Sequence, residues 1–202
     1  MKTKLILLGF SISLLFTGCK PIMYTIYGIK KPAVESEKSI KDKAIKFSLD
    51  TSNIVTVSPD EFLYVMQGQG IPDGEIFDSN GHFINYRQTN TECNAGLFDF
   101  IPNLKTDTTY ITNDSILLVE KIKKFRDFNG NMLEKIESAD FYLLIYWTVW
   151  TGKLNKDHVK IWEDLANNNQ NCDIRIIKVN LDMQDYWDEQ KLKPIWNIMR
   201  GK

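Results

Sequence analysis

Residues 141–147 read Phe-Tyr-Leu-Leu-Ile-Tyr-Trp, an unbroken run of apolar and aromatic side chains. Such a run is typical of a central strand that is covered on both faces. The following residues, 152–166, place Leu154, Ile161 and Trp162 on one stripe at helical spacing. A second apolar run, over residues 173–181, predicts another central strand. The sequence therefore predicts a strand–helix–strand unit, which is typical of an α/β fold.

Shorter elements are predicted around this unit from capping and turn signals. Ser58 and Pro59 form a helix start, and residues 78–81 read Asp-Ser-Asn-Gly, a hairpin turn. Pro194 is expected to interrupt or kink the last helix. The predicted elements are helices over 35–47, 59–66, 97–104, 113–125 and 185–199, and strands over 54–57, 75–77 and 83–86.

The segment from Phe141 to Asp182 resembles the core of the thioredoxin-like superfamily. In that family an apolar strand ends in Trp-Cys-Gly-Pro-Cys, which opens a long helix, and the next strand commonly ends in Val-Asn-Val-Asp. Here the motif position reads Trp150-Thr151-Gly152-Lys153-Leu154, and the second strand ends Val179-Asn180-Leu181-Asp182. The resemblance implies a three-layer α/β sandwich of about five strands.

The chain departs from that family at both cysteine positions, which hold Thr151 and Leu154. Disulfide exchange needs a thiolate that attacks through a mixed disulfide and a second thiol that resolves it. Threonine does not form such an anion at neutral pH, and leucine has no resolving group. A thioredoxin-type oxidoreductase is therefore excluded at this position.

The order of the elements also differs from the family order. After Asp182 about twenty residues remain, too few for the family's proline-led strand, hairpin and last helix. Gly70-Ile71-Pro72 and the hairpin after it have that appearance but lie upstream. We therefore expect a circularly permuted domain in which strands 75–78 and 141–147 are neighbours in one sheet. A non-permuted α/β sandwich of its own kind is the alternative.

The first residues predict a lipoprotein signal peptide over 1–18. Two lysines precede an apolar run over 5–16, too short to span a bilayer. Residues 15–19 read Leu-Phe-Thr-Gly-Cys and resemble a bacterial lipobox, although phenylalanine replaces the more usual Leu, Val or Ala. The resemblance implies cleavage before Cys19 and acyl chains on that cysteine, which together anchor a protein stably. An ordinary cleaved signal that happens to contain a cysteine is the alternative.

This organisation assigns residues 19–34 to a tether or arm and residues 35–202 to one α/β domain. Lys20 follows the acylated cysteine and no aspartate does, which favours the outer membrane by the general sorting pattern of such lipoproteins. The domain is then expected in the periplasm or at the cell surface, tied to the membrane by its lipid, with an envelope protein as a further partner.

The overall charge excludes some functions. The chain has 25 basic and 26 acidic residues, so it lacks the basic excess of a nucleic-acid binder. Removing the signal peptide takes away Lys2 and Lys4, and no polybasic patch that could assist membrane binding is expected from the sequence. With 3 cysteines and 2 histidines, neither a disulfide scaffold nor a metal site is predicted, and no cofactor is expected.

The best candidate binding surface lies at the end of the first central strand. It consists of Trp147, Trp150, Thr151, Gly152 and Lys153. Amides at the helix start, together with the Lys153 ammonium group, would favour an anionic group.

Two further residues, Cys93 and His158, are of types that can act in catalysis. Cys93, in Glu-Cys-Asn-Ala-Gly, is a candidate reactive thiol, with simple burial as the alternative. His158 shares the helical stripe and is expected to be half-buried in the core. The sequence thus favours a lipid-anchored cell-envelope protein whose domain binds or scaffolds without redox activity. The alternative is a thiol-dependent enzyme that uses Cys93 as its single reactive cysteine.

Overall fold

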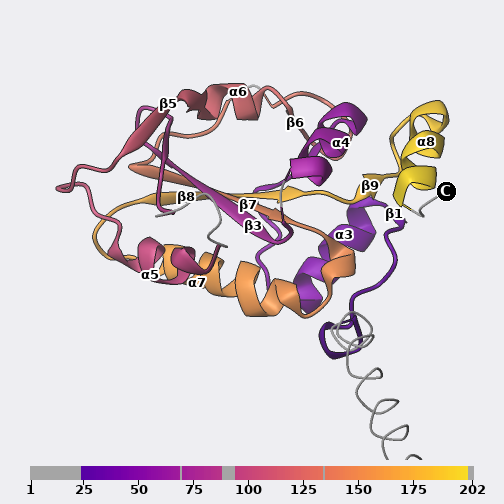
Figure 1. Ribbon diagram of the computed structural model, residues 1–202, viewed down its shortest axis with the longest axis horizontal. Helices are drawn as coiled ribbons and strands as arrows, with labels where there is room; N and C mark the ends of the chain where they lie inside the picture. Colours follow the sequence, from indigo (N-terminus) through magenta and orange to yellow (C-terminus); the bar gives the residue numbers. More distant parts are fainter. Residues whose placement is uncertain (1–23, 69, 88–93, 134, 200–202) are drawn as a thin grey trace, which may run out of the picture.

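The computed structural model describes residues 24–68, 70–87, 94–133 and 135–199. They form an α/β fold around a mixed seven-stranded sheet of order β5-β4-β3-β7-β8-β2-β6 (Figure 1). The strands are β1 (Val34–Glu35), β2 (Ile54–Val57), β3 (Asp73–Asp78), β4 (His82–Ile84), β5 (Thr112–Leu117), β6 (Phe125–Arg126), β7 (Phe141–Trp147), β8 (Ile174–Asn180) and β9 (Met183–Gln184). The helices are α3 (Glu37–Lys46), α4 (Pro59–Gly68), α5 (Leu97–Phe100), α6 (Leu118–Ile122), α7 (Ile161–Asn167) and α8 (Glu189–Met199), and the 3-10 and π turns are η1 (Asn94–Gly96), η2 (Ile101–Asn103), η3 (Val149–Thr151) and η4 (Asn155–Lys160).

Strand β7 is the middle strand of the sheet. It pairs in parallel with β8, with Phe141 opposite Ile174, and antiparallel with β3, with Tyr146 opposite Asp73. The expectation that strands 75–78 and 141–147 are neighbours in one sheet is therefore confirmed. The predicted strand–helix–strand unit is confirmed as well, as β7, η4 with α7, and β8.

The continuous apolar run of β7 follows from its burial on both faces. All seven residues are buried, and alternate side chains enter two different clusters. Leu143 and Ile145 pack in the cluster that contains residues of α3, α5 and α7, whereas Leu144 packs in the cluster that contains residues of α4, α6 and α8. Figure 1 shows α5 and α7 along one face of the sheet and α4 and α6 along the other. The result is a three-layer arrangement with a core on each side of β7.

The sheet has seven strands, so the expectation of about five is wrong. The difference lies in residues 113–125, which were expected to form one helix. They form β5, the short helix α6 and the start of β6. Residues 112–115 are Thr-Asn-Asp-Ser, side chains that compete with a helical backbone for hydrogen bonds, and β4 offers a free edge on which the segment pairs. The last helix also differs, because α8 continues through Pro194 without the expected interruption.

The segment before the domain packs onto it as an arm. Strand β1 pairs in parallel with β9, with Val34 opposite Met183, and forms a second, two-stranded sheet. The amide of Asp185 extends this contact by donating to the carbonyl oxygen of Glu35 at 3.0 Å. The described part of the predicted tether is therefore attached to the carboxyl end of β8. None of the helices in the part of the chain that the structure describes has the length and apolar character needed to cross a bilayer.

Gly74 provides a test of the packing between β3 and α5. A Cβ at this position would lie 2.6 Å from Cδ1 of Leu97, whose side chain is fully buried. We expect Gly74→Ala to lower the free energy of unfolding by about 1–3 kcal/mol, because the core must shift to admit a methyl group. Urea denaturation measures the loss. Gly70→Ala is the matched control, since no heavy atom lies within 4 Å of its added Cβ; equal losses for the two variants would contradict the packing described here.

Candidate functional site

The predicted surface at the end of β7 is partly inside the protein. Trp147 is 0% exposed and Thr151 is 2% exposed, so neither side chain lines a surface. The Thr151 hydroxyl donates to the carbonyl oxygen of Thr148 at 2.8 Å, and Asn155 donates to the same oxygen. Trp150 and Gly152 are partly exposed and Lys153 is exposed. Three of the five predicted residues therefore remain as candidates for contact with a ligand.

The arm lies directly on this turn and is held by the backbone. The amide of Lys153 donates to the carbonyl oxygen of Tyr27 at 2.7 Å, and the amide of Lys30 donates to the carbonyl oxygen of Trp150 at 2.8 Å. We call this pair of hydrogen bonds the arm clamp. The backbone amide of Lys153 is therefore already occupied by the arm, which leaves the Lys153 ammonium group as the part of this residue that could contact an anionic group. The arm clamp requires glycine at position 152, because a Cβ there would lie 2.2 Å from the carbonyl oxygen of Tyr27.

A pocket of about 400 Å³ opens where the arm, α3 and this turn meet. Its lining combines basic and apolar side chains, and we call it the basic pocket. The basic residues are Lys30, Lys31, Lys43, Lys46 and Lys153. The apolar and aromatic residues are Tyr27, Ala33, Phe47, Val149 and Trp150, and the remaining lining comes from Gly28, Glu35 and Gly152. The sequence predicts no polybasic patch that could assist membrane binding, yet the fold gathers these five lysines around one pocket from three separate segments.

The lysines of the basic pocket differ from their neighbours on α3. Lys38 and Lys41 form ion pairs at 2.6 Å with Asp42 and Glu37 of the same helix. Across residues 24–68, 70–87, 94–133 and 135–199, no carboxylate pairs with any of the five pocket lysines. The one carboxylate in the lining, Glu35, accepts a hydrogen bond from the Ser39 hydroxyl. The pocket therefore carries an excess of positive charge.

A buried carboxyl group, that of Asp182, holds the turn after β7 in place. Asp182 is 1% exposed and lies just beyond the end of β8; its Oδ2 accepts from the amide of Val149 at 2.7 Å and from Nδ2 of Asn180 at 2.8 Å. Burial raises the pKa of Asp182 to about 8, although both hydrogen bonds favour the charged form. Asp182 thus holds Val149, the residue before Trp150, in place. The backbone N–H of Val149 is then not free to bind a ligand.

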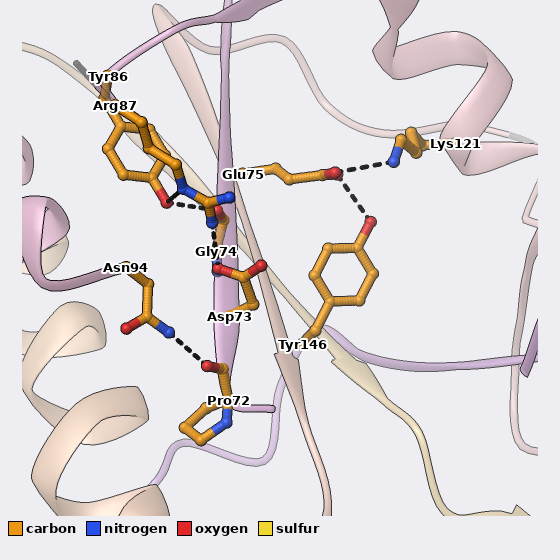
Figure 2. Close-up of polar contacts among 9 residues, drawn as sticks. All are labelled: Pro72, Asp73, Gly74, Glu75, Tyr86, Arg87, Asn94, Lys121 and Tyr146. Carbon is orange, nitrogen blue, oxygen red and sulfur yellow. Dashed lines mark hydrogen bonds and ion pairs between the residues drawn. The ribbon is translucent and has the colours of Figure 1, made fainter. Parts of the chain in front are cut away.

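A second polar cluster lies at the start of β3, next to the same end of β7. Figure 2 shows Asp73 facing Arg87, and Glu75 between Lys121 and Tyr146. The ion pair from Arg87 to Asp73 measures 2.6 Å, and that from Lys121 to Glu75 measures 2.8 Å. Burial raises the pKa of Asp73, and the charge of Arg87 opposes this shift. Each carboxylate has its own cation, so this cluster needs no ligand to balance its charge.

The remaining predicted residues do not join either cluster. Cys19 and Cys93 lie outside the described residues. Cys172 is a free thiol that donates to the carbonyl oxygen of Leu104, and burial raises its pKa to about 11. His158 is half-buried against the rings of Phe98 and Trp162, as expected. Among the described residues, no group of three or more His, Cys, Asp or Glu side chains is placed to hold a metal ion.

Comparison with known proteins adds no assignment. No protein-family model matches the chain, and searches of curated proteins and of solved structures found no match. The basic pocket is therefore the candidate functional site on the grounds of its own geometry and charge.

Sequence reasoning found the turn at 150–153 but missed the four lysines of the arm and α3. These residues are neighbours only after β1 has paired with β9 and α3 has packed on the sheet. One local signal was present: Lys43 has Ser39 and Phe47 four residues away on either side, so no helical ion pair was open to it.

Gly152 tests the arm clamp. Its φ is +62°, and any side chain would also strike the backbone of the arm. We expect Gly152→Ala to cost more than about 2 kcal/mol of unfolding free energy and to speed tryptic cleavage after Lys30 about tenfold, because the arm must leave the turn. Urea denaturation and timed proteolysis measure the two effects. Gly28→Ala is the matched control, because it has the same φ but an open surrounding; arm cleavage that is unchanged in Gly152→Ala would refute the clamp.

Asp182 predicts a pH dependence of stability. The folded pKa of about 8 lies above the ordinary value of 3.8, so between about pH 4 and pH 8 the folded chain holds a proton that the unfolded chain has released. Stability therefore falls as the pH rises through this window. We expect Asp182→Asn to remove this slope. The unfolding free energy of the variant minus that of the wild type should therefore rise by at least about 2 kcal/mol from pH 4 to pH 8. Urea denaturation at several pH values measures it, with the exposed Asp188→Asn as control; a gap that stays constant with pH would contradict the burial of Asp182.

Proposed function

We propose that this chain is a lipid-anchored cell-envelope protein whose thioredoxin-like domain is redox-inactive and acts as a binding module. The strand order supports the fold part of the proposal. Strand β7 lies between β8, which is parallel to it, and β3, which is antiparallel to it and directly follows Pro72. In a permuted thioredoxin-like domain, the central strand and the strand that follows the proline are expected to be neighbours in this way.

The observation that carries the proposal is the state of the turn after β7. Where the family has its reacting cysteine, this chain has the buried hydroxyl of Thr151, which donates to the carbonyl oxygen of Thr148. A hydroxyl held in this way supplies no nucleophile for disulfide exchange. Leu154, at the second cysteine position, supplies no resolving group. The arm clamp also covers Gly152 between these two positions.

The anchor part of the proposal rests on the lipobox that ends at Cys19. The described arm begins 5 residues later, at Tyr24, and leads to the basic pocket. Acyl chains on Cys19 would hold the domain at an envelope membrane, for which we favour the outer membrane. The domain would then act by binding, either to an envelope protein or to an anionic ligand in the pocket.

The proposal is tested with the membrane-extracted full chain in detergent. We expect the intact mass to show acyl chains on a mature chain that begins at Cys19. We also expect reduction of a protein disulfide by dithiothreitol to run at the rate without added protein, with thioredoxin as the positive control. Catalysis above that rate would contradict the redox-inactive domain.

The rival function, a single-thiol enzyme, is tested on Cys93. In a Cys172→Ser variant Cys93 is the only remaining thiol if Cys19 is acylated. We expect its alkylation rate to rise with a midpoint near or above the ordinary thiol pKa of about 8.5. A midpoint well below pH 8 would favour the enzyme over the binding module.

A further inference from the structure

The basic pocket collects charge that is dispersed in the sequence. Lys30 and Lys31 come from the arm, Lys43 and Lys46 from α3, and Lys153 from the turn after β7. With Glu35 as the one carboxylate in the lining, the formal charge around the pocket is strongly positive. Gathering like charges raises the free energy of the folded chain unless a counter-charge approaches. The gathering therefore points to an anionic partner.

The two sides of α3 separate structural lysines from pocket lysines. Lys38 and Lys41 reach acidic residues one turn away and are neutralised within the helix. Lys43 and Lys46 face the pocket and, in the described part of the chain, have no carboxylate partner. The same helix thus supplies two lysines without an ion pair, Lys43 and Lys46, and two lysines with one, Lys38 and Lys41, as a matched control.

The lining also contains a large apolar part. Phe47, 8% exposed, and Val149, 6% exposed, form part of the wall, and the half-buried Trp150 contributes an aromatic ring. A small hydrated anion would gain nothing from these side chains. An amphiphilic anion, with a charged group beside an apolar part, would use both halves of the lining.

The position of the pocket on the chain favours a membrane lipid as the source of that anion. Tyr27, which lines the pocket, is the eighth residue after Cys19. An extended chain covers at most about 3.5 Å per residue, so the anchor would hold Tyr27 within about 28 Å of the bilayer surface. This step rests on the proposed acylation of Cys19.

We propose that the basic pocket binds the phosphate-bearing headgroup of an anionic membrane lipid. The lysine ammonium groups are compact charges that bind phosphate without a fixed geometry. The aromatic part of the lining contacts the apolar region next to the headgroup. Binding seats the domain on the membrane in one orientation, with the arm and α3 toward the surface.

The test uses the acylated full chain reconstituted in vesicles of phosphatidylcholine, with or without phosphatidylglycerol. An uncharged amine-acylating reagent labels the lysines, and mass spectrometry gives the rate at each site. We expect phosphatidylglycerol to slow labelling of Lys43 and Lys46 about tenfold or more, and to leave Lys38 and Lys41 within about twofold, because only the first pair faces the pocket. The protection should disappear in about 1 M salt.

Variants test the charge directly. Lys30→Gln with Lys31→Gln removes two pocket charges at exposed sites on the arm. It should weaken binding of the headgroup about 30-fold, at about 1 kcal/mol per lysine, and so remove most of the protection of Lys43 and Lys46. Lys38→Gln with Lys41→Gln is the matched control and should leave that protection unchanged. Equal effects of the two double variants would overturn the pocket as the binding site.

Further samples distinguish a lipid headgroup from a soluble phosphate as the source of the anion. Inorganic phosphate or glycerol phosphate is added to phosphatidylcholine vesicles, and protection of Lys43 and Lys46 there at millimolar concentration would overturn the lipid headgroup in favour of a soluble phosphate ligand. If no sample shows protection although the intact mass shows acyl chains, the headgroup site is overturned, and the proposed lipid-anchored binding module is unaffected. An intact mass without acyl chains would instead overturn the anchor on which the site depends.

Discussion

The arm clamp is the contact on which the candidate site depends. Two backbone hydrogen bonds, from Lys153 to Tyr27 and from Lys30 to Trp150, join the arm to the turn after β7. They require close approach of two backbones, which Gly152 alone allows at that position. Without the clamp the basic pocket would lose one wall and the two lysines that the arm contributes. The clamp also covers Gly152 in the turn after β7, between Thr151 and Leu154.

The buried charged residues of the described chain differ from the lysines that line the basic pocket. Most buried charged groups of the described chain are in ion pairs, as in the 2.9 Å pair between Lys178 and Glu163, whose side chains are both 2% exposed. The carboxylates of β3 in Figure 2 are paired in the same way. Asp182 is the exception and is held by hydrogen bonds from Val149 and Asn180. Buried charges need such partners, because leaving one of them alone costs several kcal/mol. The lysines of the basic pocket lack them in the described chain, and this contrast distinguishes a binding surface from a structural ion pair.

Residues 141–181 show how much of the fold can be predicted from the chain. The apolar runs at 141–147 and 173–181 are local patterns typical of central strands covered on both faces, and both strands were predicted correctly. The neighbouring position of β3 was also predicted, from the resemblance to a permuted thioredoxin-like domain. Residues 113–125 were mispredicted as one helix, because the first part of this segment pairs with the free edge of β4, a contact that no local pattern reveals. The basic pocket could not be predicted because it depends on contacts between residues more than 100 positions apart, such as Lys30 and Trp150.

The most direct test of this account is the through-hydrogen-bond scalar coupling between the amide nitrogen of Lys153 and the carbonyl carbon of Tyr27. It is measured by nuclear magnetic resonance on the isotope-labelled full chain. The account predicts a detectable coupling for this pair and for Lys30 with Trp150. A resolved Lys153 amide that shows no coupling to Tyr27, in spectra where the sheet amides do show their couplings, would contradict the clamp and the pocket built on it.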